Sequence, residues 1–253
     1  MVRRMTTTTA RKDGRLTTDL RNVSFETGYI AHHKGSVLVS FGSTKVLCVA
    51  TAEERVPPHR KDSGGGWVTA EYAMLPGSTH DRKQRERQKQ DGRSVEIQRL
   101  IGRALRNVVD MNLIGQRQIN VDCDVIQADG GTRTASITGG FVALALCIHD
   151  LQQRKLPMKA KTLRQAMPSQ VAAVSLGVHG GQILTDLCYS EDSAAETDLN
   201  IVARSDGGIV EIQGTAEGQP LARAELDQLV DQGLAAIAVL CAKQRDALGG
   251  IWV

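Results

Sequence analysis

The sequence predicts a mixed α/β fold of two halves, each combining a β-sheet with a helix. Three observations predict it: short runs rich in β-branched residues occur in both halves, two long stretches have helical spacing, and a polar, proline-containing segment at 155–170 separates the halves. We expect one domain over residues 1–253, with internal halves at about 11–155 and 170–253 and a disordered extension at residues 1–10.

The composition is that of a soluble globular protein. Hydrophobic residues make up 41% of the 253 residues and charged residues 23%, so the chain can bury a core. Aromatic residues are only 3%, so stacking of bases on aromatic rings has little to work with. The net charge of +3 is too small to indicate nucleic-acid binding by itself. Any prediction of nucleic-acid binding must therefore rest on local clusters of charge.

The cysteines and the start of the chain point to a reducing compartment. The five cysteines lack CxxC spacing and lie in apolar stretches, which favours buried thiols over disulfides. No apolar run approaches the length of a membrane span, and residues 1–10 lack the apolar core of a secretory signal. We expect a cytoplasmic protein with no membrane partner.

The first half opens with strands. Ser36–Phe41 and Lys45–Thr51 are β-rich and are separated by Gly42-Ser43-Thr44, which is typical of a hairpin. From Val95 to Met111 apolar residues recur at helical spacing with arginines between them, which predicts an amphipathic helix with a basic side. Ile119–Val125 then alternates apolar and polar residues, the period of a strand with one buried face.

A glycine-rich corner at Asp129–Arg133 leads into the second predicted helix. Thr134–Asp150 is mostly apolar and is broken only by Gly139-Gly140. In the second half the patterns predict four strands and a closing helix, with no clear internal repeat. The strands are expected at Val171–Val178, Gln182–Leu187, Leu199–Ala203 and Ile209–Gln213, and the helix at Ala222–Arg245.

The stretch Gly130–Thr134 has the composition of an anion site. Glycine N–H groups, two hydroxyls, the Arg133 guanidinium and a helix start are gathered within it. The alternative is a purely structural turn, but an arginine in a glycine corner needs a partner. Arg93 starts the basic helix and joins the same anion if the two helix starts converge. Otherwise Arg93 is an ordinary solvated residue.

Two aspartates follow in the second half. Asp192 and Asp198 lie six residues apart in a turn-rich stretch between two expected strands. Paired carboxylates at this range can hold Mg²⁺, with Asn200 as a further oxygen ligand, or one can act as a general acid beside a leaving group. The alternative is a loop whose acids only cap turns.

A basic run extends from His80 to Lys89. It carries five Arg and Lys side chains and no apolar residue. Basic charge in a loop can follow the backbone of single-stranded nucleic acid. A charge run is more often just a solvated loop.

Several strings resemble the ribonuclease PH family closely. They are Arg11–Arg15, Gly35–Gly42, Thr44–Cys48, Gly66–Tyr72, Glu96–Arg106, Cys123–Ala135 and Glu191–Asp198. The resemblance covers essentially residues 11–247. It implies the ribonuclease PH fold, which is like domain 2 of ribosomal protein S5, in a homo-hexameric ring built as a trimer of dimers.

The same resemblance implies an enzyme and its substrates. Members are phosphorolytic 3′-to-5′ exoribonucleases, or tRNA nucleotidyltransferases. They remove 3′-terminal nucleotides of precursor tRNA and other RNA with inorganic phosphate as co-substrate and release nucleoside 5′-diphosphates. The reaction reverses as nucleotide addition.

The resemblance also implies roles for individual residues. The residues implied to bind phosphate are Arg93, Gly131, Thr132 and Arg133. Asp192 and Asp198 are implied to take part in catalysis and to bind the cofactor Mg²⁺. Arg82, Arg85 and Arg99 are implied to bind RNA. After Pro76, where relatives often carry a further basic residue, this chain has Gly77. The resemblance therefore does not extend the RNA contact to that position.

Three other interpretations stay open. An RNA-binding ring subunit that has lost catalysis would not need Arg93, Arg133, Asp192 and Asp198 together. A fragment of polynucleotide phosphorylase would be followed by further RNA-binding domains, for which this chain has no room. A small-molecule phosphotransferase using the same glycine corner would leave the basic run unexplained.

Overall fold

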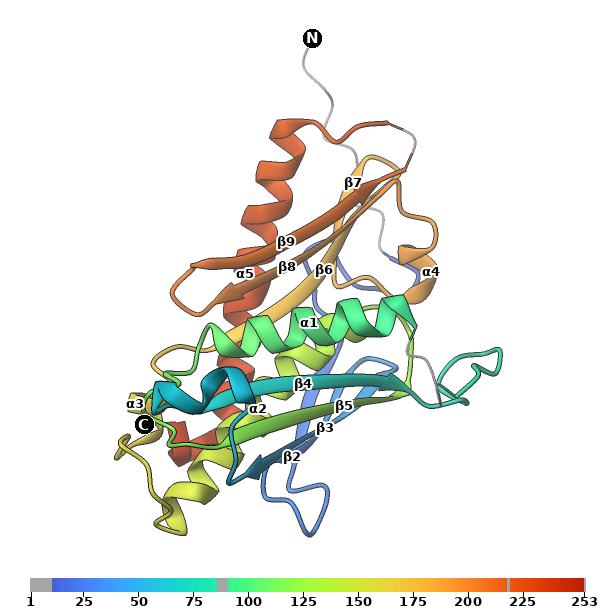
Figure 1. The fold of residues 1–253 in the computed structure, drawn as a ribbon. Helices are drawn as coiled ribbons and strands as arrows, with labels where there is room; N and C mark the ends of the chain where they lie inside the picture. The colour runs from blue at the N-terminus through green and yellow to red at the C-terminus, as the bar shows by residue number, and fades with distance from the viewer. Residues whose placement is uncertain (1–10, 86–90, 218, 253) are drawn as a thin grey trace.

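Two β-sheets with helices between and beside them make up the computed structural model of the chain (Figure 1). The structure describes residues 11–85, 91–217 and 219–252; the expected extension at 1–10 and the part of the basic run at 86–90 lie outside the described residues. The predicted mixed α/β fold of two sheet and helix halves is confirmed.

The first half forms a five-stranded sheet in the order β1-β2-β3-β5-β4. Its elements are β1 (Val23–Thr27), β2 (Ser36–Phe41), β3 (Thr44–Glu53), the short 3₁₀ helix η1 (Pro58–Ser63), β4 (Trp67–Met74), α1 (Gly92–Arg106), β5 (Gln118–Gln127) and α2 (Thr132–Gln153).

The second half forms a four-stranded antiparallel sheet in the order β7-β6-β8-β9. Its elements are α3 (Leu163–Ala166), β6 (Val171–His179), β7 (Gln182–Thr185), α4 (Tyr189–Asp192), β8 (Thr197–Arg204), β9 (Ile209–Ala216), α5 (Arg223–Leu248) and the 3₁₀ helix η2 (Gly249–Trp252).

The first sheet buries one face, as the alternating pattern predicts. On β5, Ile119, Val121, Cys123 and Val125 are fully or almost fully buried, while the residues between them are only partly covered. The sequence patterns missed two strands, β1 and β4. On β1 only Val23 is buried, and an edge strand with so little burial has no clear apolar alternation.

Helix α2 fills the space between the two sheets. We expected Gly139-Gly140 to interrupt it, and this was wrong, because the helix runs unbroken through both glycines. A Cβ on Gly139 would lie 2.5 Å from Val39 Cγ1 and 3.0 Å from Cys48 Sγ. The glycine therefore lets the helix approach the first sheet closely.

The apolar length of α2 belongs to the core. By length and composition this 22-residue helix could cross a membrane, but 83% of its most apolar window is buried inside the protein. It contacts β2 and β3 on one side and β6 on the other. Four cysteines are buried as expected, and Cys188 is partly exposed.

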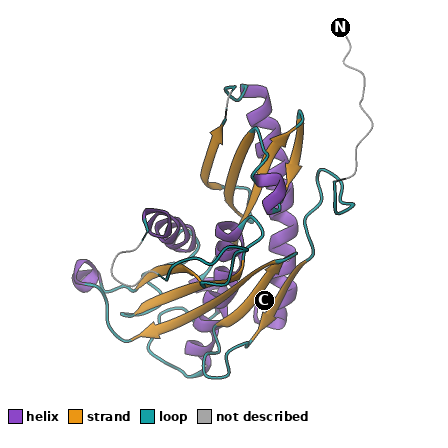
Figure 2. Cartoon of the chain, turned by 90° about the vertical axis from the view of Figure 1, so that its right-hand side faces the viewer, coloured by secondary structure: helices purple, strands orange, loops and turns teal. Residues whose placement is uncertain are grey.

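The second sheet is covered on both faces. Eight consecutive residues of β6, Val171–Val178, are buried, which is the pattern of a strand between two layers. Helix α2 packs on one face, and α5 packs against β6 and β8 from the other. Figure 2 shows this layering from the side, with helices between the two sheets and a long helix along the second.

Candidate active site

The two helix starts converge because of the order of the strands. β4 and β5 are parallel neighbours, and α1 connects them. Helix α1 therefore begins beyond the carboxyl end of β4, and α2 begins beyond the carboxyl end of β5, at the same edge of the sheet. Arg93 lies in the first turn of α1, and Thr132 and Arg133 lie in the first turn of α2.

Tyr72 marks the place where these residues meet. Its hydroxyl lies near the end of β4, is buried, and forms a 2.8 Å hydrogen bond with Thr132 Oγ1. Burial raises the pKa of Tyr72, while the hydrogen bond and the positive charges of Arg93 and Arg133 act against the rise. Both guanidinium groups are thus close enough to act on one buried hydroxyl.

The glycine corner is fixed through its carbonyl groups. Gly130 and Gly131 have φ values of 72° and 63°, in the left-handed region that glycine tolerates. The Gly130 carbonyl accepts a 2.7 Å hydrogen bond from Thr44 Oγ1. Gly131 is the N-cap of α2 and offers no side chain, so the first N–H groups of the helix are available to an anion.

Arg133 is held in place by two neighbouring side chains. Its guanidinium donates to Gln213 Oε1 on β9 at 3.1 Å and forms an ion pair with Glu96 Oε1 at 3.4 Å. Arg93 is exposed. One arginine of the pair is therefore oriented by the second sheet, and the other faces solvent.

The acidic pair comes from the second half. We expected both aspartates in a loop; this was wrong for Asp198, which lies in β8, whereas Asp192 is the last residue of α4. Asp198 is paired with Gly177 of β6 and Thr215 of β9, and the Thr215 hydroxyl donates to its carboxylate. Asp198 thus has a position fixed by two neighbouring strands.

Charge interactions indicate that the basic and acidic groups lie near one another. The pKa of Asp192 is raised, first because burial removes water from its carboxyl and then because Asp198 is negatively charged. The positive charges of Arg93, Arg133 and Arg21 oppose the rise. Asp192 is therefore close both to its acidic partner and to the arginines on the helix starts.

Two neighbouring carboxylates fit a magnesium ion. Mg²⁺ is usually held by one or two protein carboxylates together with water and substrate phosphates. Asp192 and Asp198 supply that donor set, and Asn200 lies on the same face of β8 as Asp198. Within residues 11–85, 91–217 and 219–252 no group of three or more His, Cys, Asp or Glu side chains forms a fuller metal site.

The residues expected to contact RNA lie in two places. Arg82 and Arg85 are exposed in the segment that follows β4, which leaves the sheet at the edge where the helix starts converge. Arg99 is exposed on α1, on the side it shares with Glu96 and Arg103. That side faces β9, because Arg103 binds Glu211 there at 2.6 Å. Arg87 and Lys89 lie outside the described residues.

Sequence reasoning missed Tyr72, Glu96, Gln213 and Thr215. Tyr72 could have been found, since it continues the buried face of Val68 and Ala70 and its hydroxyl must find a partner there. Gln213 and Thr215 could not, because only the pairing of β9 with β8 places them beside Asn200 and Asp198.

Comparison with known proteins gives matches along most of the chain. Domain 1 of the 3′ exoribonuclease family matches residues 19–148, and domain 2 of the same family matches residues 169–236.

Solved structures share the fold at low sequence identity. Rrp46 of rice (Oryza sativa) has 16% identity and a TM-score of 0.74, covering 94% of this chain and 100% of that chain. The Archaeoglobus fulgidus exosome with RNA bound to the active site has 23% identity and a TM-score of 0.77, covering 92% of each chain. An archaeal exosome core has 22% identity and a TM-score of 0.70, covering 93% of this chain and 91% of that chain. Because the family model spans both halves, the chain belongs to the 3′ exoribonuclease family.

Proposed function

We propose that the chain is a phosphorolytic 3′-to-5′ exoribonuclease of the ribonuclease PH type. It shortens RNA by transferring the 3′-terminal nucleotide to inorganic phosphate, with precursor tRNA as a substrate. One observation carries the proposal: two arginines and an open helix start gather beside a pair of aspartates at the junction of the halves. An anion site next to a carboxylate pair suits phosphate as the attacking group.

The chemistry needs no covalent enzyme intermediate. Phosphate held by Arg93, Arg133 and the N–H groups at Gly131 and Thr132 attacks the last phosphodiester phosphorus. The bond to the 3′ oxygen breaks, and the products are a nucleoside 5′-diphosphate and RNA one nucleotide shorter. Catalysis is then mainly positioning and electrostatic stabilisation of the transferring group. Bond energies nearly balance, so excess diphosphate drives nucleotide addition.

The two aspartates have two roles in this proposal. Asp192 and Asp198 would hold Mg²⁺, which neutralises charge on the phosphate groups when bound. The pair would also assist departure of the 3′ oxygen, because Asp192 lies close to Asp198 and to the arginines that would hold the phosphate.

RNA would reach the site along basic side chains. Arg82 and Arg85 are exposed beyond the edge where the site lies, and Arg99 lies on α1. We propose further that six copies form a ring as a trimer of dimers, in which basic loops surround a channel for the RNA strand. The likeness to exosome structures, one of them with RNA bound to its active site, supports an assembly of this kind.

Product analysis tests the proposal. The purified protein is incubated with an RNA carrying a short 3′ tail and Mg²⁺, with or without phosphate. We expect nucleoside diphosphates only when phosphate is present. Nucleoside monophosphates without phosphate would mean hydrolysis and would overturn the proposal.

A second candidate is a non-catalytic RNA-binding subunit of a mixed ring. The similarity to Rrp46 and to exosome cores favours it, since those structures are named for exosome proteins. RNA binding without release of any nucleotide, in the same experiment, would support this candidate.

A further inference from the structure

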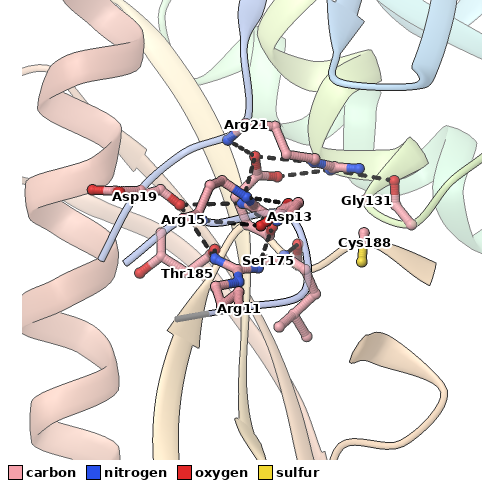
Figure 3. A network of polar contacts seen from close by, with 12 residues as sticks. Arg11, Asp13, Arg15, Asp19, Arg21, Gly131, Ser175, Thr185 and Cys188 are labelled. Atoms are coloured by element: carbon pink, nitrogen blue, oxygen red, sulfur yellow. Dashed lines mark hydrogen bonds and ion pairs between the residues drawn. The ribbon is translucent and has the colours of Figure 1, made fainter. Parts of the chain in front are cut away.

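The segment from Arg11 to Arg21 precedes the first sheet but binds to the second half (Figure 3). The N–H of Thr185, the last residue of β7, donates to the Thr17 carbonyl at 2.8 Å. Arg11 and Arg21 are only 7% and 6% exposed. Burying two guanidinium groups is costly unless every hydrogen-bonding position finds a partner. The partners of these arginines lead to the candidate active site.

Arg21 connects the segment to the glycine corner. Its Nη1 donates to the Asp129 carbonyl at 2.5 Å, directly before Gly130, and its Nη2 donates to the Gly130 carbonyl at 3.5 Å. Its Nε and Nη2 bind the Asp186 carboxylate at 3.1 and 2.7 Å. Asp186 is fully buried and has a φ of 55°, which is unusual for a residue other than glycine.

Arg11 connects the same centre to the acidic pair. It donates to the carbonyls of Thr185 at 2.6 Å and Asp186 at 3.1 Å, and its Nε binds Glu191 at 2.6 Å. Glu191 also accepts the Cys188 N–H at 3.0 Å, at the start of α4. Glu191 directly precedes Asp192, so the bridge from Arg11 fixes the turn that carries the aspartate.

We propose that Arg11 and Arg21 are positioning residues of the active site, Arg11 setting Asp192 through Glu191 and Arg21 setting the phosphate corner through Asp129. Asp186 joins the two, because its carboxylate binds Arg21 and its carbonyl binds Arg11. The inference rests on the proposed function and extends it to residues that touch neither RNA nor phosphate. Neither arginine is a catalytic residue.

The geometry of the bridge agrees with this role. Arg11 Nε and Nη2 each donate to a different oxygen of the Glu191 carboxylate, and Arg15 Nη2 lies 3.5 Å from the same carboxylate. A lysine at either arginine keeps the charge but cannot reproduce the planar fork that binds several oxygens at once.

The roles proposed for Arg11 and Arg21 predict different changes in the kinetic parameters. Initial rates are measured over a range of phosphate concentrations for wild type, Arg11→Lys and Arg21→Lys. Arg11→Lys should lower kcat about 10-fold or more with the KM for phosphate within about 3-fold, because a displaced aspartate affects the chemical step. Arg21→Lys should raise that KM about 10-fold or more with a smaller change in kcat. Glu191→Gln should behave like Arg11→Lys.

Arg204→Lys is the matched control. Arg204 forms an ion pair with Asp206 in the turn between β8 and β9, and both kinetic parameters should stay at wild-type values. Thermal unfolding of each variant separates a shifted site from a loss of folded protein. The proposal would be overturned if both arginine variants changed kcat and the KM for phosphate in the same way. It would also be overturned if neither variant changed either parameter.

Two further measurements do not depend on activity. Calorimetric titration with inorganic phosphate should show about 10-fold weaker binding to Arg21→Lys and unchanged binding to Arg11→Lys. Hydrogen exchange of peptides covering α4 should speed up in Arg11→Lys alone. If wild type releases no nucleoside diphosphate, the proposed function fails, and these two readouts still decide whether the arginines position the site.

Discussion

At the residue scale, the two arginines of the candidate phosphate site differ in how they are held. Arg133 is oriented by Gln213 and Glu96, while Arg93 is exposed at the start of α1. A prearranged guanidinium loses little freedom when an anion binds, whereas an exposed one must become ordered. Arg133 should therefore contribute more to the affinity for phosphate.

Arg133→Ala tests this ranking. Removing a charged hydrogen-bond donor should cost roughly 2–3 kcal/mol, which raises the KM for phosphate by about 30- to 150-fold. Assembly should stay intact, as judged by sedimentation. Arg154→Ala is the control, because Arg154 lies at the other end of α2 and forms an ion pair with Asp150. Unchanged phosphate dependence in Arg133→Ala would refute its role.

The aspartates are tested by removing charge alone. Asp192→Asn or Asp198→Asn should lower turnover by about 100-fold or more, in the range of positioned acid and base groups, without unfolding the protein. Turnover is measured at saturating phosphate and Mg²⁺, with circular dichroism as the check on folding. Asp206→Asn, in the turn between β8 and β9, should retain activity. A fully active double substitution would exclude both aspartates from catalysis.

At the element scale, the site depends on a close approach between the glycine corner and the segment before α4. A Cβ on Gly130 would lie 2.6 Å from the Leu187 carbonyl oxygen and 2.8 Å from the Cys188 carbonyl carbon. Both contacts are with backbone, which cannot turn aside as a flexible side chain can. The glycine therefore lets the glycine corner lie directly against the segment that carries Asp192.

Gly130→Ala should damage both stability and activity. The positive φ and the backbone clash together should cost about 2 kcal/mol or more, lowering the melting temperature by several degrees. Gly250→Ala is the control, since nothing lies within 4 Å of a Cβ there. Thermal unfolding and turnover are measured for both variants. A Gly130→Ala protein with wild-type turnover would show that the close approach is not required.

The loop after β4 is expected to act through charge alone. Arg82→Ala and Arg85→Ala should weaken RNA binding equally for different sequences. Each should also reduce the steepness of the salt dependence by about 0.7, the value for one phosphate contact on a single strand. Affinities are measured at several salt concentrations, with Arg223→Ala on α5 as the control. A change in sequence preference instead would indicate contact with bases.

At the scale of the whole molecule, the site lies where the two halves meet. Arg133 and Arg103 of the first half form hydrogen bonds with Gln213 and Glu211 of the second half, respectively. Relative movement of the halves would therefore separate the residues of the candidate site. The fold thus makes the geometry of the site depend on the packing between the sheets. A ring of subunits would add contacts for the RNA outside this junction.

The proposed ring makes a prediction about RNA length. Dilution that dissociates the assembly, followed by sedimentation, should weaken the binding of long RNA more than that of short oligomers, because only long RNA reaches several subunits at once. Binding is measured at the same dilutions for both lengths. Equal weakening would reject a shared channel.

The sequence by itself determined most of the helices and strands and the kinds of functional group present. Alternation along β5, the apolar run of α2 and the glycine corner between them are local patterns, because side-chain period and turn residues follow from a few neighbouring positions. The same patterns supplied an arginine and a helix start beside glycines, and two aspartates six residues apart.

Only the tertiary structure decided how these pieces meet. The parallel pairing of β4 with β5 brings Arg93 to Arg133, and the pairing of β8 with β9 sets Thr215 beside Asp198. The contacts of Arg11 with Glu191, 180 positions away in the sequence, likewise depend on the tertiary structure. Strand order and long-range ion pairs depend on which surfaces the whole chain can bury together, and no local pattern contains that information.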